Sequence, residues 1–109
     1  MERISLQSVV DVNLEAVRST ARGHSATTVH GGGGRRLRQS VLALAAGAQI
    51  AEHTSPAEST LLVLDGKVRV DAGNRSAELG SGDLLALPIG RHSVVAIEDS
   101  ALLLTVALG

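Results

Sequence analysis

Residues 47–66, GAQIAEHTSPAESTLLVLDG, contain the pattern that decides the fold. A short strand-like run carries His53, a Ser-Pro turn follows it, and a second apolar run ends at Asp65 and Gly66. Residues 82–99, GDLLALPIGRHSVVAIED, form a matching half in which His92 comes shortly after a proline and a glycine. Two strand pairs that each present one histidine predict a small all-β barrel with a polar site inside.

The remainder of the chain after residue 34 also has the pattern of short strands. In residues 67–72 the apolar Val68, Val70 and Ala72 alternate with charged side chains, which is typical of a half-buried strand. The other predicted strands cover residues 35–44, 48–54, 59–65, 75–79, 83–88, 92–99 and 101–108. Turn residues recur about every eight to twelve positions, a spacing that favours a sandwich or barrel.

The N-terminal segment differs from the rest because it has helical periodicity. Residues 9–21 are the predicted helix, and their apolar stripe, at positions i, i+4, i+7 and i+11, consists of Val10, Leu14, Val17 and Ala21. Residues 24–30 follow as a predicted strand and the four glycines of 31–34 as a flexible turn. We expect residues 1–34 to belong to the same single domain as the barrel of residues 35–109.

Composition excludes several classes of protein. The 109 residues are 44% hydrophobic and 19% charged with a net charge of −1, which is typical of a globular domain and indicates no nucleic-acid partner. The absence of cysteine excludes disulfides and thiolate metal sites. Neither a run of about 20 apolar residues nor a signal-peptide core is present, so we expect a cytoplasmic protein without a membrane partner.

The chain has no phenylalanine, tyrosine or tryptophan. Binding of bases by aromatic stacking is therefore excluded. The core must consist of leucine, valine, isoleucine and alanine, and such small side chains can leave a cavity inside the barrel.

The two histidine-bearing stretches resemble the two motifs of the cupins, a superfamily of small jelly-roll barrels. The first motif is G-x5-H-x-H-x3,4-E-x6-G. Gly47, His53 and Gly66 match it, whereas Ser55 occupies the second histidine position. Ser59 occupies the glutamate position when the count runs back from the closing glycine, and Glu58 stands one residue earlier.

The second cupin motif is G-x5-P-x-G-x2-H-x3-N, and its glycines and proline correspond to Gly82, Pro88 and Gly90. His92 comes one residue sooner than the pattern requires, and Ala96 stands near the asparagine position. The resemblance extends over residues 35–107. It implies a double-stranded β-helix, that is, a jelly-roll cupin barrel with a short N-terminal helix, of the uncharacterised bacterial type with a degenerate metal motif.

The resemblance also implies a candidate metal site. Its ligands would be His53 and His92, with Glu58 as the added carboxylate, and the ion would be a divalent Fe, Mn, Ni or Zn. Glu58 reaches the same face only if the turn before it absorbs a one-residue slip, because such a slip reverses a strand side chain. In the alternative interpretation both histidines are hydrogen-bonding pocket residues without a metal.

Strict alternation predicts the remaining pocket residues. It places Gln49, His53 and Ser55 on one face of their strand and Ile50 on the other, and it places Ser59 on the same face as Leu61. The predicted ligand pocket therefore includes Gln49, Ser55 and Ser59. No catalytic nucleophile set is recognisable.

Three functions remain open at this stage. The first is a small cupin that binds a small molecule in the barrel, for which the resemblance implies dioxygenase, isomerase or decarboxylase chemistry if a metal is present. The second is a non-catalytic, metal-free module that senses a ligand, and a purely structural interaction domain is a third. The apolar run of residues 101–108 predicts a face that pairs with a second copy as a homodimer.

Overall fold

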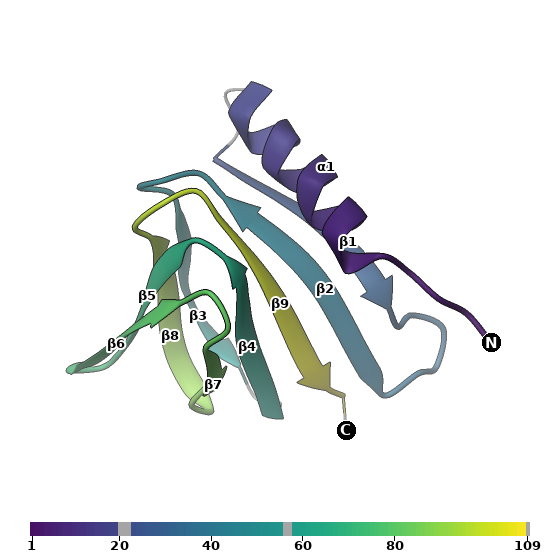
Figure 1. Cartoon of the computed structure of the whole chain (residues 1–109). Coiled ribbons are helices and arrows are strands. Elements are labelled where there is room, and N and C mark those ends of the chain that lie inside the picture. The colour runs from purple at the N-terminus through teal and green to yellow at the C-terminus, as the bar shows by residue number, and fades with distance from the viewer. Residues whose placement is uncertain (20–22, 56–57, 109) are drawn as a thin grey trace.

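The computed structural model describes residues 1–19, 23–55 and 58–108, and of residues 51–55 it describes the backbone alone. The described chain folds into two antiparallel sheets that face each other, with one helix packed outside the first sheet (Figure 1). The elements are α1 (Leu6–Ser19), β1 (His24–His30), β2 (Leu37–Leu44), β3 (Gln49–Ser55), β4 (Glu58–Asp65), β5 (Lys67–Ala72), β6 (Arg75–Gly80), β7 (Leu84–Ala86), β8 (Gly90–Ala96) and β9 (Ser100–Ala107).

The two sheets have the crossed strand orders that a jelly roll requires. The first sheet runs β1-β2-β9-β4-β7 and the second β3-β8-β5-β6. Because β8 and β9 follow each other in sequence but lie in different sheets, as do β2 and β3, the chain crosses repeatedly between the layers. The prediction of an all-β jelly-roll barrel with a short N-terminal helix is confirmed.

Most predicted elements occur close to their expected positions. The strands at residues 24–30 and 67–72 match their predicted bounds, and the helix begins at Leu6 rather than at residue 9. Ser5 explains the earlier start, because its hydroxyl accepts a hydrogen bond of 3.2 Å from the Ser8 N–H and so caps the helix. Ala21 of the predicted apolar stripe lies outside the described residues.

The apolar cluster between the sheets consists of aliphatic side chains. Its buried members include Leu61, Val63, Val68 and Leu102, each at most 1% exposed. A second apolar cluster lies between α1 and the outer face of the first sheet, where the stripe of Val10, Leu14 and Val17 packs on β2 and β9. Transfer of these side chains out of water provides the main stabilisation of both layers.

A buried polar group attaches the helix to β1. Asn13 is 2% exposed, and its side-chain amide donates hydrogen bonds of 2.9 Å to the Val9 carbonyl and to Thr27 Oγ1. Its side-chain oxygen accepts a 2.6 Å bond from Ser25 Oγ. Because β1 pairs with β2 along its length, these bonds join residues 1–34 to the barrel.

The apolar run of residues 101–108 is used inside the monomer. It forms most of β9, which is the central strand of the first sheet and pairs with β2 and β4. Its inward side chains, such as Leu102, enter the core, and Ala101 and Leu103 pack in the cluster under α1. The apolar character of the run is thus explained without the second copy that the sequence predicts at this place.

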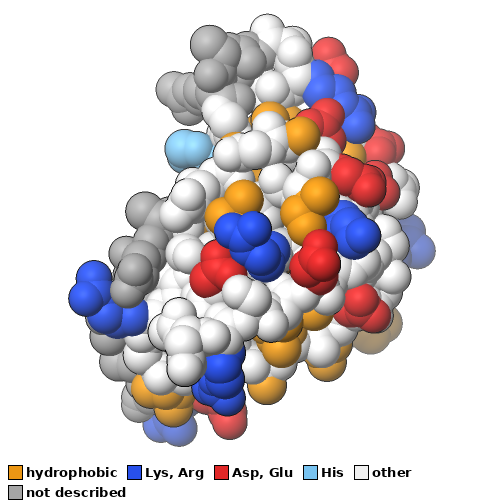
Figure 2. Space-filling view, turned by 90° about the vertical axis from the view of Figure 1, so that its left-hand side faces the viewer, with side chains coloured by type: hydrophobic (Ala, Val, Ile, Leu, Met, Phe, Trp, Pro, Cys, Tyr) orange, Lys and Arg blue, Asp and Glu red, His pale blue; other side chains and the backbone are white. Residues whose placement is uncertain are grey.

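Charged side chains lie on the outside of the barrel. On β5 the side chains of Val68 and Val70 are buried and those of Lys67 and Arg69 are exposed, as the alternation predicts. Figure 2 shows basic and acidic side chains interspersed on one face of the molecule. Among the described residues, no helix is both long and apolar enough to cross a lipid bilayer.

Candidate ligand cavity

A cavity of about 380 Å³ lies between the two sheets. Among the described residues that line it, seven are leucine, isoleucine or valine, and the polar ones are His24, Ser59 and His92. A concave, mostly apolar pocket with a few polar groups is the usual form of a small-molecule site. This cavity is therefore the candidate functional site.

His92 is the most buried titratable side chain of the cavity. It lies on β8 and is 3% exposed. Val94, two residues further on, is also buried and lines the same cavity, so the alternation of β8 directs both side chains inward. His92 therefore lies between the two sheets, in the cavity.

The backbone of His53 lies directly opposite that of His92. In the β3–β8 pair the Cα partners are Gln49 with Val95, Ile50 with Val94, and His53 with His92. The register shifts between Ile50 and His53, so β3 has one extra residue there, which is a β-bulge. The side chains of His53 and Ser55 lie outside the described residues.

The bulge changes which residues of β3 reach the cavity. Ile50 lines it, whereas Gln49 is exposed and pairs with the outward Val95. Strict alternation predicted the reverse for Gln49 and Ile50, because it counted two-residue steps through the extra residue. Gln49 therefore does not line the cavity in the structure.

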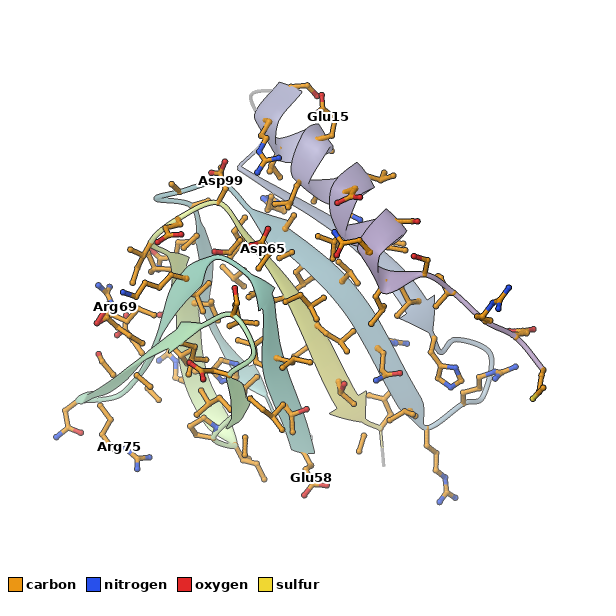
Figure 3. All side chains as sticks on the ribbon, viewed as in Figure 1. Glu15, Glu58, Asp65, Arg69, Arg75 and Asp99 are labelled. Atoms are coloured by element: carbon orange, nitrogen blue, oxygen red, sulfur yellow. The ribbon has the colours of Figure 1, made fainter. Side chains whose placement is uncertain are left out.

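Ser59 and Glu58 lie on opposite faces of β4. Ser59 is 6% exposed and lines the cavity, on the same face as Leu61, as the sequence predicts. Glu58 is exposed, and in Figure 3 its side chain extends away from the barrel at the start of β4. The strand begins at Glu58 without a slip, so its carboxylate does not enter the cavity.

The described side chains do not by themselves make up a metal site. Among those described, no three His, Asp or Glu side chains gather closely enough to hold an ion. His92 offers one imidazole to the cavity, and the backbone of His53 lies opposite it in the β3–β8 pair. Two imidazoles supply fewer ligands than the three that catalytic zinc and iron sites usually take from the protein.

His24 is a cavity residue that the sequence interpretation missed. It is the first residue of β1 and lines the cavity while remaining exposed. In the structure, Ser25 and Thr27 of β1 hydrogen-bond Asn13 of the helix, on the outer side of the sheet. Because strand side chains alternate, His24 must then lie on the barrel side.

Comparison with known proteins identifies the class of fold. No protein-family model matches the sequence, and no curated protein does. A cupin superfamily protein from Desulfitobacterium hafniense matches in structure with a TM-score of 0.75 and 18% identity, over 100% of this chain and 94% of that one.

Two other structures show the same likeness. KdgF from a Halomonas species has a TM-score of 0.72 and 21% identity, over 80% of this chain and 82% of that chain. A variant of salicylate 1,2-dioxygenase from Pseudoaminobacter salicylatoxidans has a TM-score of 0.78 and 19% identity, over 97% of this chain but 34% of the enzyme. The chain therefore has the fold of these cupin structures, as the two motifs predicted.

Proposed function

We propose that this cupin domain binds a small molecule inside the barrel, with His92 and Ser59 as the polar groups that orient it. The observation that carries the proposal is that both residues are buried and line a cavity whose other described walls are mostly aliphatic. A few polar groups in a mostly apolar pocket provide the directional contacts that orient a small molecule.

A divalent metal is the second element of the proposal. His53 and His92 would hold it, because opposed residues of an antiparallel pair lie on one face of the sheet about 5 Å apart. When bound, such an ion supplies a Lewis acid that polarises an oxygen of the ligand. The two histidines position it, and the aliphatic walls limit the access of water.

The alternative is a metal-free module that senses its ligand without transforming it. One observation favours it, namely that the described side chains hold no group of three metal-binding residues. In this alternative His92 and Ser59 serve as hydrogen-bonding groups alone. Metal affinity discriminates between the two functions, and ligand binding is common to both.

We also propose that the protein forms a homodimer through the free edge of β1. This strand is terminal in the first sheet, and no other described strand pairs with its outer edge. Its sequence, HSATTVH, has no lysine, acidic residue or proline of the kind that prevents edge pairing.

The predicted cytoplasmic location and the expected lack of nucleic-acid and membrane partners rest on the sequence and remain predictions.

A ligand screen followed by methyl NMR tests the proposal. We expect bound fragments to shift the methyl signals of Leu61, Val94 and Leu104, which line the cavity. The methyl groups of Val10 and Leu14, in the separate cluster under α1, serve as internal controls and should not move. Fragments that shift the signals under α1 but none in the cavity would contradict the proposal.

A further inference from the structure

The cavity has a polar group at each end of the first sheet. His24 pairs with Leu44, which pairs with Ser100, the first residue of β9. Ser59 instead pairs with Val106, near the last residue of β9. The six residue steps from Ser100 to Val106 correspond to about 20 Å along an extended strand.

A single cavity of about 380 Å³ reaches both ends. Its lining residues therefore extend along most of the length of the first sheet, so a ligand that contacts both ends must itself be long. The side chains between the ends are aliphatic, with Leu42, Leu61 and Leu104 from the first sheet and Ile50 and Val94 from the second.

The chemistry of these walls restricts the ligand. With no phenylalanine, tyrosine or tryptophan in the chain, the described lining offers a planar aromatic ligand only the imidazole rings of His24 and His92. Leucine, isoleucine and valine instead favour methylene groups, each of which gains about 0.8 kcal/mol when it is buried.

The exposed end of the cavity favours an anion. A ring N–H of His24 can donate to a carboxylate in either protonation state of the imidazole. No aspartate or glutamate is among the described residues that line the cavity, so no like charge opposes the anion there. A carboxylate beside the exposed His24 also keeps contact with water, which lowers the cost of its desolvation.

We propose that the ligand is an unbranched, medium-chain aliphatic carboxylate whose carboxylate binds His24 and whose chain extends along the barrel toward Ser59 and His92. This inference names the ligand class of the proposed function and therefore rests on the same cavity. It does not depend on a metal.

Calorimetry on the metal-free protein, with hexanoate, octanoate, decanoate, decanol and benzoate as probes, tests the inference. We expect one decanoate per chain and an affinity that rises about fourfold for each added CH2, the factor that corresponds to the burial of one methylene. Benzoate should bind at least tenfold more weakly than decanoate. Equal affinities for hexanoate and decanoate, or tighter binding of benzoate, would overturn the inference.

The role of His24 has a matched control on the same strand. The variant His24→Ala should bind decanoate at least tenfold more weakly and decanol within twofold of the unsubstituted protein. His30→Ala, at the other end of β1 and not among the cavity residues, should bind both probes normally. Unchanged decanoate binding by His24→Ala would refute the assignment of the carboxylate to this end.

The same samples separate this inference from the proposed function. If fragments shift the cavity methyl signals but no carboxylate of any length binds, the ligand class is wrong and the cavity proposal stands. If decanoate binds and its affinity depends on His24, the ligand class is supported whether or not the protein takes up zinc.

Discussion

His53 and His92 are direct Cα partners across the β3–β8 pair, although 38 residues lie between them in the chain. The bulge in β3 between Ile50 and His53 produces this register. An opposed pair in adjacent antiparallel strands can share one bound atom, because its Cα atoms are about 5 Å apart. This relationship makes metal affinity the first property to measure.

Two imidazoles should hold a divalent ion weakly, because water must supply the rest of the coordination shell. We expect protein dialysed against metal-free buffer to retain well under one metal per chain in mass spectrometry. Added Zn²⁺ should bind with one equivalent, and both His92→Ala and His53→Ala should weaken that binding at least tenfold.

Glu58→Gln is the control for this measurement, since the Glu58 side chain is exposed and extends away from the barrel. It should leave zinc affinity unchanged within twofold. If Glu58→Gln weakens zinc binding as strongly as His92→Ala, the glutamate is a ligand as the family resemblance implied. Full retention of metal through dialysis would show that the site has more ligands than this pair.

The substitution Asn13→Ala should destabilise the fold by about 2–4 kcal/mol. It removes three hydrogen bonds and leaves Ser25 and Thr27 without the partner that they have beneath α1. Urea denaturation followed by circular dichroism measures the loss. Gln7→Ala removes only an exposed side-chain bond to Asp11 and should change stability by less than about 0.5 kcal/mol.

The tight turn at Gly66 should not tolerate a larger residue. Gly66 has a φ of 91°, and a Cβ added there would meet the Asp99 carbonyl oxygen and Ser100 Oγ at 2.4 Å. Ser100 is fully buried and cannot move away, so Gly66→Ala should cost more than about 3 kcal/mol in unfolding experiments.

The variant Gly73→Ala is the control that measures the cost of backbone strain at a positive φ without a steric clash. Gly73 has a φ of 62° but nothing within 4 Å of an added Cβ, so strain alone should cost about 1–2 kcal/mol. Equal losses in the Gly66 and Gly73 variants would contradict the importance of the contact with Ser100.

The carboxyl of Asp71 provides a prediction of pH dependence. The hydrogen bond from Ser76 and, to a smaller extent, the neighbouring Arg69 lower its pKa below the ordinary 3.8, against the opposing effect of desolvation. Since the folded state has the lower pKa, the stabilisation is complete above about pH 4 and is lost as the pH falls through the folded-state pKa.

An NMR titration of the Asp71 carboxyl measures this effect. In Ser76→Ala the pKa should rise toward the ordinary value, because the first of its causes is removed. Ser81→Ala, in the turn after β6, is the matched control and should leave the titration unchanged. If the pKa of Asp71 stays low in Ser76→Ala, Arg69 and not Ser76 is the main cause of the shift.

Size-exclusion chromatography with light scattering, which measures molar mass, tests the homodimer prediction. We expect the unsubstituted protein to have twice the chain mass of 11.2 kDa. The variant Ala26→Lys places a charge on the exposed edge strand β1 and should have the mass of a monomer. Asn74→Lys, in the turn between β5 and β6, should remain dimeric. A dimer that persists in Ala26→Lys would exclude the β1 edge as the interface.

Local patterns in the sequence were sufficient to predict the helix and most of the strands. The alternation of residues 67–72 and the stripe of Val10, Leu14 and Val17 depend on near neighbours alone, and both appear in the structure as predicted. The spacing of the two glycine- and histidine-containing stretches predicted the cupin barrel, and the structural comparisons confirmed that fold.

The composition of the cavity depended on longer-range geometry. A bulge is a property of the pairing between β3 and β8. The sequence of β3 alone could therefore not show that Ile50, rather than Gln49, lines the cavity. His24 reaches the cavity because β1 pairs with β2 while α1 covers the opposite face, and no local spacing relates residue 24 to residue 92.

Residue type and the periodicity of neighbouring residues were enough to predict an all-β barrel, an apolar core of aliphatic side chains and two histidine-bearing strands. Which described side chains share the cavity, namely His24, Ser59 and His92 but not Gln49 or Glu58, followed from the folded chain. The physical reason is that the inward or outward direction of a strand residue depends on its register with the neighbouring strand, and a single extra residue reverses that direction.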